Sequence, residues 1–212
     1  MRLHGLFKRC IFSKASKREV KRREEIVQKR AYHINTPFSE KDIEKLRSGD
    51  KALITGVIYG ARDLVHKKFM ESIDKGENLP IHLRGQVIYY TGMSPAPPGK
   101  VVGAVGPTSS YRMDKYAPKL MELGLKGMIG KGPRSDTVKD AIIKYKAVYM
   151  AAIGGAGALL STTIKKARVV AYEEFGPEAL MEFYVEGFPV VVVNDIYGND
   201  LYIEGQRRYC IK

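Results

Sequence analysis

Residues 106–114 read Gly-Pro-Thr-Ser-Ser-Tyr-Arg-Met-Asp, a glycine–proline turn followed by three hydroxyl residues and an arginine. Pro107 blocks an earlier helix and the hydroxyl side chains can cap one, so the segment predicts a helix from about Thr108. On such a helix Thr108 and Arg112 lie one turn apart on the same face. With the free N–H groups of the helix start, they would suit a carboxylate or phosphate. The alternative is a capped helix with a solvated arginine.

Strand and helix patterns alternate on both sides of this stretch. This alternation predicts an α/β fold with a partly parallel sheet, and strand pairs without an intervening helix add hairpins or a second sheet. Strands are predicted at 51–58, 86–90, 101–105, 125–129, 147–152, 168–172 and 190–193, with a short one at 201–203. Helices are predicted at 41–47, 62–74, 108–123 and 137–145 and after 154–158, whereas 178–185 fits either element.

The composition, 44% hydrophobic over 212 residues, is that of a globular chain with one sizeable core. No apolar run reaches the roughly 18 residues of a membrane span. Cys10 and Cys210 stand at opposite ends, which gives neither a disulfide framework nor a metal motif and fits a reducing cytoplasm. Since a four-iron cluster normally takes several thiolates, we expect no cluster on this chain alone, and the four histidines show no metal-site spacing.

The positive charge is concentrated at the N-terminus. Residues 1–30 carry a net charge of +8, whereas the whole chain carries +13. We therefore expect a basic N-terminal extension at 1–31, with a short helix opened by a capping box at Ser16 and running to about Gln28, and a domain at 32–212. The extension fits a solvated arm or a partner-binding helix, a contact with nucleic acid or an acidic surface, a transit peptide, or an over-long gene start.

A second cationic motif, Arg-Asp-Leu-Val-His-Lys-Lys at 62–68, follows a predicted strand directly. Arg62 and His66 share one helix face, and Asp63 can pair with Lys67 on the surface. An arginine at a strand-to-helix junction is well placed to bind an anion. The alternative is an ordinary helix start with a surface ion pair.

A third motif, Gly-Lys-Gly-Pro-Arg-Ser at 130–135, also follows a predicted strand. Its glycines let the backbone approach a ligand, and Lys131 offers a compact positive charge to a carboxylate or phosphate. The spacing of a nucleotide P-loop is absent, and an ordinary turn is the alternative. Ser135 can cap the next helix. The glycine-rich run at 154–157 lacks the dinucleotide pattern, so we expect it to pack a helix on the sheet.

The three cations Arg62, Arg112 and Lys131 each follow a predicted strand. Ligands in open α/β sheets collect at the carboxyl ends of strands, so three cations converging there would bind a dianion. No acid–base pair, triad or metal-binding group accompanies them. The sequence therefore predicts one half of an active site.

These motifs occur in the same order in one protein family. The chain resembles the β subunit of class I iron–sulfur fumarase and L(+)-tartrate dehydratase over about 32–203, a module that is also the C-terminal domain of single-chain class I fumarases. The resemblance is carried by Gly60-Ala61-Arg62-Asp63 with His66-Lys67, Tyr90-Thr91-Gly92 with Pro95-Ala96 and Pro98-Gly99, Gly106-Pro107-Thr108-Ser109 with Arg112-Met113-Asp114, Lys126-Gly127-Met128-Ile129-Gly130-Lys131-Gly132 with Arg134-Ser135, Phe175-Gly176 with Glu178-Ala179, Phe188-Pro189, Asp195 and Gly198-Asn199.

The resemblance implies a swivelling β/β/α domain, an α/β fold with helices packed on a mixed sheet. It implies a hydro-lyase that hydrates fumarate to L-malate or, alternatively, dehydrates tartrate to oxaloacetate. The implied partners are a dicarboxylate and an α subunit whose [4Fe–4S] cluster polarises the substrate hydroxyl. An α2β2 assembly or a homodimer of this chain in the cytoplasm is expected, with no membrane or nucleic-acid partner. A non-catalytic anion sensor or a nucleic-acid-binding module is the alternative from another class.

The resemblance also implies residue roles. Arg62, Arg112 and Lys131 would bind the substrate carboxylates, and Arg112 and Lys131 would also act in catalysis by stabilising charge that builds on a carboxylate. Thr108 matches the family's catalytic base, although a threonine hydroxyl is a poor base at neutral pH, so its neighbours must favour the alkoxide. The family often has a second threonine at position 109, where this chain keeps a hydroxyl as serine. The residues expected to orient the site from around it are Asp63, His66, Ser109, Asp114 and Ser135.

Overall fold

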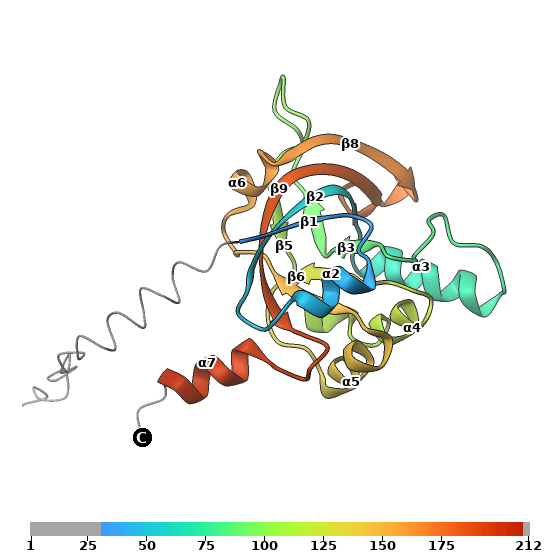
Figure 1. The fold of residues 1–212 in the computed structure, drawn as a ribbon. Coiled ribbons are helices and arrows are strands. Elements are labelled where there is room, and N and C mark those ends of the chain that lie inside the picture. The colour runs from blue at the N-terminus through green and yellow to red at the C-terminus, as the bar shows by residue number, and fades with distance from the viewer. Residues whose placement is uncertain (1–30, 210–212) are drawn as a thin grey trace, which may run out of the picture. The chain divides into compact units, whose positions relative to one another are not determined.

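The computed structural model describes residues 31–209, so the helix predicted at 16–28 lies outside the described residues. The fold is α/β, with a seven-stranded mixed sheet, a two-stranded sheet and packed helices, which confirms the predicted fold class (Figure 1). The strands are β1 (Tyr32–Asn35), β2 (Lys51–Gly60), β3 (Val87–Tyr89), β4 (Thr91–Met93), β5 (Val105–Pro107), β6 (Gly127–Gly130), β7 (Val148–Ala151), β8 (Ile164–Ala171) and β9 (Leu180–Asn194). The helices are α2 (Glu40–Lys45), α3 (Asp63–Asp74), α4 (Ala117–Glu122), α5 (Asp136–Tyr145), α6 (Gly157–Ser161) and α7 (Leu201–Tyr209), with the 3₁₀ helices η1 (Ser110–Met113) and η2 (Glu173–Glu178).

The large sheet has a parallel part that is closed by one long antiparallel strand. Strands β1, β2, β3, β6 and β7 pair in parallel, in that order. Strand β9 pairs antiparallel with β7 on one side and with β2 on the other, and β8 adds to it. The pairings β2–β3–β6–β7–β9–β2 therefore form a closed ring, and the carboxyl ends of the parallel strands meet at one edge.

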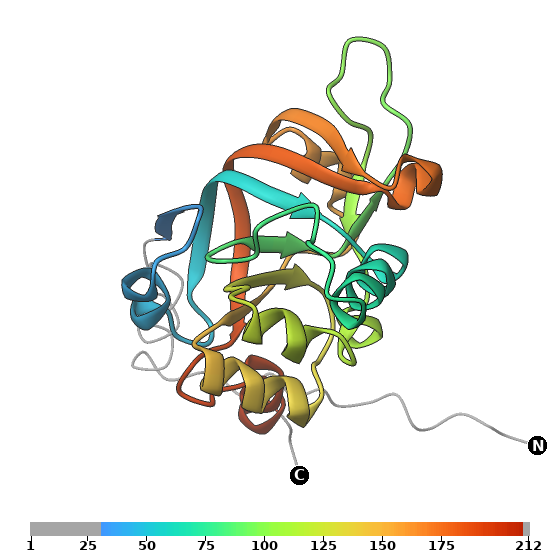
Figure 2. The same cartoon turned by 90° about the vertical axis from the view of Figure 1, so that its right-hand side faces the viewer.

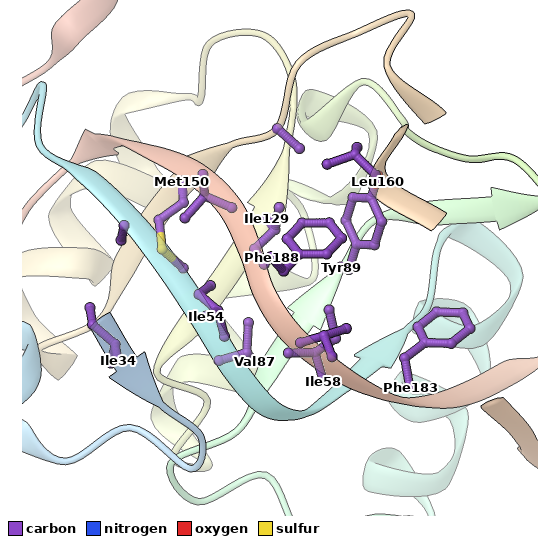
Figure 3. Packing of buried hydrophobic residues seen from close by; sticks show 14 of the residues in the cluster. Ile34, Ile54, Ile58, Val87, Tyr89, Ile129, Met150, Leu160, Phe183 and Phe188 are labelled. Carbon is purple, nitrogen blue, oxygen red and sulfur yellow. The ribbon is translucent and has the colours of Figure 1, made fainter. Parts of the chain in front are cut away.

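Alternating residues of the parallel strands face two separate cores, as the period of two in a strand dictates. In β3, Val87 and Tyr89 face the inside of the ring, whereas Ile88 faces the helices. The inner core is filled by β-branched and aromatic side chains, with the rings of Tyr89 and Phe188 at 5.2 Å and nearly perpendicular (Figure 3). Side chains of β9 contribute to this core along most of its length.

The second core lies between the parallel strands and the helices α3, α4 and α5, which lie along one side of them (Figure 2). The apolar residues of α3 recur at helical spacing, with Val65 and Phe69 fully buried. This layer fixes where α3 begins, immediately after the end of β2. The position of Arg62, the first residue before that helix, therefore depends on the core beneath it.

The predicted single helix at 108–123 is wrong. Thr108 is extended, a 3₁₀ turn follows at 110–113, and α4 begins only at Ala117. Pro118 is the local reason, because proline fits the first turn of a helix and not its interior. The tertiary reason is that Thr108 and Ser110 pair with the loops after β3 and β6 instead of with their own segment.

Three further predictions need correction or completion. Most of the strand predicted at 101–105 is a loop, and only Val105 belongs to β5; the proline-rich segment 94–104 projects from the body (Figures 1 and 2). The short strand predicted at 201–203 is the start of α7, because the Asp200 carboxylate accepts the N–H of Tyr202 and caps a helix. The ambiguous segment 178–185 is strand and continues through 190–193 as β9.

The inner core gives a test of the ring. Replacing Phe188 by alanine removes a fully buried ring between β9 and β3, and we expect the free energy of unfolding to fall by about 3–5 kcal/mol. Replacing Tyr184 by alanine, on the same strand but 38% exposed, should cost about 1 kcal/mol or less. Urea denaturation of both variants measures the difference, and equal losses would contradict this description of the core.

Candidate functional site

The carboxyl ends of the parallel strands bring two of the predicted cations to one edge of the sheet. Arg62 follows β2 and stands at the start of α3, and Lys131 follows β6. Arg112 arrives by a different route, in η1 after the small β4–β5 sheet. The prediction that strand ends carry these side chains is confirmed for Arg62 and Lys131, whereas Arg112 lies in η1, beyond the end of a strand of the second sheet.

Thr108 is held beside Lys131 by backbone pairing. The N–H of Thr108 donates to the Tyr90 carbonyl at 2.7 Å, and the N–H of Lys131 donates to the Thr108 carbonyl at 3.2 Å. Ser109 lies opposite Lys131 in a parallel bridge. The predicted arrangement of Thr108 and Arg112 on one helix face is therefore wrong, and strand-like backbone pairing places the Thr108 segment beside Lys131.

A small residue is required where these two segments meet. A Cβ on Gly130 would lie 2.1 Å from Ser110 Oγ and 3.2 Å from the Thr108 carbonyl oxygen. The buried Ser110 hydroxyl instead contacts the Tyr149 hydroxyl at 2.9 Å, and Tyr149 donates to the Gly132 carbonyl at 2.8 Å. This buried chain ties the Thr108 segment to the Lys131 loop. Sequence reasoning missed Tyr149 because its strand pattern signals only burial.

Asp63 joins the two arginines. Its Oδ2 accepts from Arg62 Nε at 3.2 Å and from Arg112 Nη2 at 2.5 Å. Burial alone would raise the pKa of Asp63, but a hydrogen bond from its own backbone N–H and the two guanidinium groups together lower it. Asp63 is thus a carboxylate at physiological pH and holds two cations together. The predicted pairing with Lys67 is wrong, since Lys67 pairs with Glu71.

An open pocket of about 440 Å³ lies against these groups. Within residues 31–209, the Thr108 hydroxyl makes no hydrogen bond and the Lys131 ammonium makes no ion pair. Arg62 and Thr108 line the pocket, whereas Arg112 and Lys131 adjoin it through Asp63 and through the backbone bridge. Among the other lining residues are Gly92, Gly106, Phe175, Pro177 and Glu178.

Asp114 and Ser135 support the Lys131 loop from behind. Asp114 accepts from Arg134 Nε at 2.7 Å and from the Ser135 N–H at 2.6 Å. Ser135 does occupy the position before α5, as predicted, but its own side chain makes no capping hydrogen bond. Arg134 is completely buried, with its guanidinium carbon 4.8 Å from the centre of the Tyr149 ring. This ion pair anchors the loop in the second core.

His66 lies below the site and not in it. It is fully buried, and its Nδ1 donates to the Arg62 carbonyl at 2.8 Å, since that oxygen can only accept. Nε2 has no hydrogen-bond partner among the described residues. Burial lowers the pKa of His66 to about 4, with a further lowering by Arg134. The imidazole is therefore neutral at physiological pH and braces the residue before α3.

The arrangement can bind an anion, and its residues do not fit a metal cluster. One cation and a free hydroxyl line the open pocket, and two further cations belong to the segments that hold them. Residues 31–209 contain no group of three or more His, Cys, Asp or Glu placed to hold a metal ion, and both cysteines lie outside that range. Across the same residues, none of the helices has the length and apolar character needed to cross a membrane.

Comparison with known proteins identifies the family. The profile described as Fumarase C-terminus matches residues 8–205, and the chain belongs to this family. The matched range begins within the basic segment 1–31, which lies outside the range of the motif-based resemblance.

Relatives of this chain include whole enzymes and a subunit. The "Fumarate hydratase class I, aerobic" of Salmonella typhimurium is 36% identical over 181 residues, covering 84% of this chain and 31% of that protein. The "Fumarate hydratase 2" of Leishmania major is 36% identical over 183 residues, covering 80% of this chain and 32% of that protein. The "Putative L(+)-tartrate dehydratase subunit beta" of Methanocaldococcus jannaschii is 35% identical over 177 residues, covering 81% of this chain and 91% of that protein. The chain thus spans about a third of the fumarate hydratases but almost all of the subunit.

The buried imidazole predicts a pH dependence of stability. Unfolded His66 takes up a proton below its ordinary pKa of 6.5, whereas the folded residue does so only near 4, so stability falls as the pH falls through this window. In His66→Phe this loss disappears. The backbone N–H of residue 66 still donates to the Arg62 carbonyl in the variant. The difference in unfolding free energy between pH 7 and pH 4.5 should be roughly 2 kcal/mol smaller in the variant. Urea titrations at both pH values measure it, and an identical pH dependence would refute the assignment.

Proposed function

We propose that this chain is the carboxylate-binding half of a hydro-lyase that interconverts fumarate and L-malate. The observation that carries the proposal is an open pocket lined by Arg62 and the free Thr108 hydroxyl, with Arg112 tied to Arg62 through Asp63 and Lys131 paired with the Thr108 segment. Family membership and the fumarate hydratase relatives support the same reaction class. L(+)-tartrate dehydration is the second candidate, because this chain covers almost all of a relative with that name.

The chemistry of the substrate explains why cations are needed. Both directions of the reaction pass through a state in which the carbon next to a carboxylate has lost its proton. Negative charge then builds on that carboxylate, and fixed guanidinium and ammonium groups stabilise it. In our proposal Arg62 and Arg112 orient one carboxylate, and Lys131 meets the developing charge.

Thr108 is the proposed proton carrier. In the dehydration direction its alkoxide oxygen takes the proton from carbon and becomes the hydroxyl, and in hydration that hydroxyl returns the proton to carbon. A threonine hydroxyl at its ordinary pKa is a weak base, so a nearby positive charge must favour the alkoxide. In the proposal Lys131 supplies this charge, because its backbone pairs with Ser109, the residue that follows Thr108.

A partner chain completes the proposed site. The class I hydro-lyases that the chain resembles depend on a [4Fe–4S] cluster, whereas this sequence has two cysteines and residues 31–209 hold no group of side chains placed to bind a metal. We therefore propose that an iron–sulfur α subunit carries the cluster and the remaining catalytic groups. The name of the M. jannaschii relative, a subunit beta, supports a separate partner. An α2β2 assembly in the cytoplasm is part of the proposal.

The proposal predicts which side chains turnover needs. In the complex with the iron–sulfur subunit, prepared without oxygen, Thr108→Ala and Lys131→Ala should each lower kcat for fumarate hydration by about 10²-fold or more. Thr108→Ser keeps the hydroxyl and should retain a larger share of the activity. Lys119→Ala removes a lysine that pairs with Glu122 on the surface of α4 and should leave kcat unchanged.

The outcome is read from steady-state kinetics with fumarate and, in parallel, with tartrate. Turnover of tartrate alone would move the assignment to the second candidate. A complex with a competent cluster that converts neither dicarboxylate, or full activity in Lys131→Ala, would refute the proposed function.

A further inference from the structure

One wall of the pocket is formed by a turn that supplies none of the proposed carboxylate-binding or catalytic side chains. It comprises the end of η2, where Phe175, Pro177 and Glu178 line the pocket. Gly176 stands in the middle of this turn with φ +53° and ψ −118°, a backbone conformation that residues with a side chain rarely adopt. The turn brings the Glu178 carboxylate to Arg62, with 3.3 Å between Oε2 and Nε.

Arg62 is held on three sides. Asp63 and Glu178 both approach the guanidinium at Nε, and the Arg62 side chain is only 22% exposed. On the third side the side chain crosses Gly92, where a Cβ would lie 3.2 Å from Nη1. Within residues 31–209, neither Nη1 nor Nη2 of Arg62 makes a hydrogen bond. The protein therefore binds the guanidinium of Arg62 at Nε, and the terminal groups Nη1 and Nη2 remain available to a ligand.

Asp63 and Glu178 differ in the cations that they contact. Asp63 is shared, since its Oδ2 also accepts from Arg112. Among the cations of the site, Glu178 contacts Arg62 alone. An arginine has many rotamers, and one shared carboxylate at the adjacent position leaves much of that freedom. A second carboxylate from a distant segment restricts the guanidinium to the pocket wall.

We infer that Glu178 is a positioning residue that fixes Arg62 so that its terminal amino groups meet a substrate carboxylate. The inference rests on the proposed function and adds a residue to the same site. Preorganisation of a binding group lowers the cost of reaching the reactive geometry, so its loss weakens both binding and turnover. Because the contact at Nε is an ion pair without a hydrogen bond, an uncharged side chain at position 178 cannot replace the carboxylate.

The test compares three single variants in the iron–sulfur complex. Glu178→Ala should lower kcat/KM for the dicarboxylate by about tenfold or more, with the larger part of the effect on KM. Glu178→Gln keeps the length of the side chain but removes its charge, so it should lose about as much as Glu178→Ala. Glu174→Ala is the matched control, because Glu174 lies in the same turn but lines a separate hollow with Lys68 and Tyr172.

A fourth variant, Gly176→Ala, tests the backbone that aims Glu178. No atom lies within 4 Å of the Cβ that alanine would carry, so any effect comes from the conformation and not from a clash. We expect it to lower kcat/KM as Glu178→Ala does. Wild-type kinetics in Glu178→Ala or in Glu178→Gln, or an equal loss in Glu174→Ala, would overturn the inference.

A spectroscopic measurement separates this inference from the proposed function. The ¹⁵N–¹H signal of Arg62 Nε, assigned through Arg62→Lys, reports the ion pairs directly in this chain. Solvent exchange of its proton should accelerate about tenfold or more in Glu178→Ala and stay unchanged in Glu174→Ala. An unchanged exchange rate in Glu178→Ala would overturn the inference even if the complex hydrates fumarate. If the wild-type complex converts no dicarboxylate, this signal still decides whether Glu178 holds Arg62.

Discussion

The pairing of β9 with both β2 and β7 is the constraint on which the rest of the structure depends. It closes five strands into a ring, and the ring encloses an aromatic and β-branched core. Closure fixes the parallel strands side by side, so their carboxyl ends present the segments after β2, β3 and β6 at one edge. The helices α3 to α5 cover one side of these strands, and the site is built at their junction with the edge.

Charge in the site is organised by pairs of unlike groups, with some cations left unpaired. Asp63 ties two arginines together, Glu178 anchors one of them, and Asp114 holds the buried Arg134 under the Lys131 loop. Lys131 has no ion pair with a described residue. These buried or half-buried carboxylates thus hold cationic side chains in position, and the cations still outnumber the carboxylates around the pocket. Such an arrangement favours an anionic ligand without any further group from this chain.

The sequence allowed the fold class and two cations to be predicted because their signals are local. Arg62 and Lys131 directly follow apolar strands, and strand ends are where α/β folds bind ligands. The helix predicted from Thr108 failed because pairing with Tyr90 and Lys131, distant in sequence, overrides local capping propensity. Pro118 was a local signal against it. Glu178 could not be found as a partner of Arg62, since the two are joined only by tertiary structure.

The most direct test of the central claim, that this chain supplies one half of a shared site, is fumarate hydration measured without oxygen for three samples. These are this chain alone, the iron–sulfur subunit alone, and their mixture at equal concentration. Our account predicts turnover in the mixture only, saturating as the second chain is titrated to equivalence. Turnover by the iron–sulfur subunit alone, at the rate of the mixture, would contradict it, because the carboxylate-binding cations would then come from elsewhere.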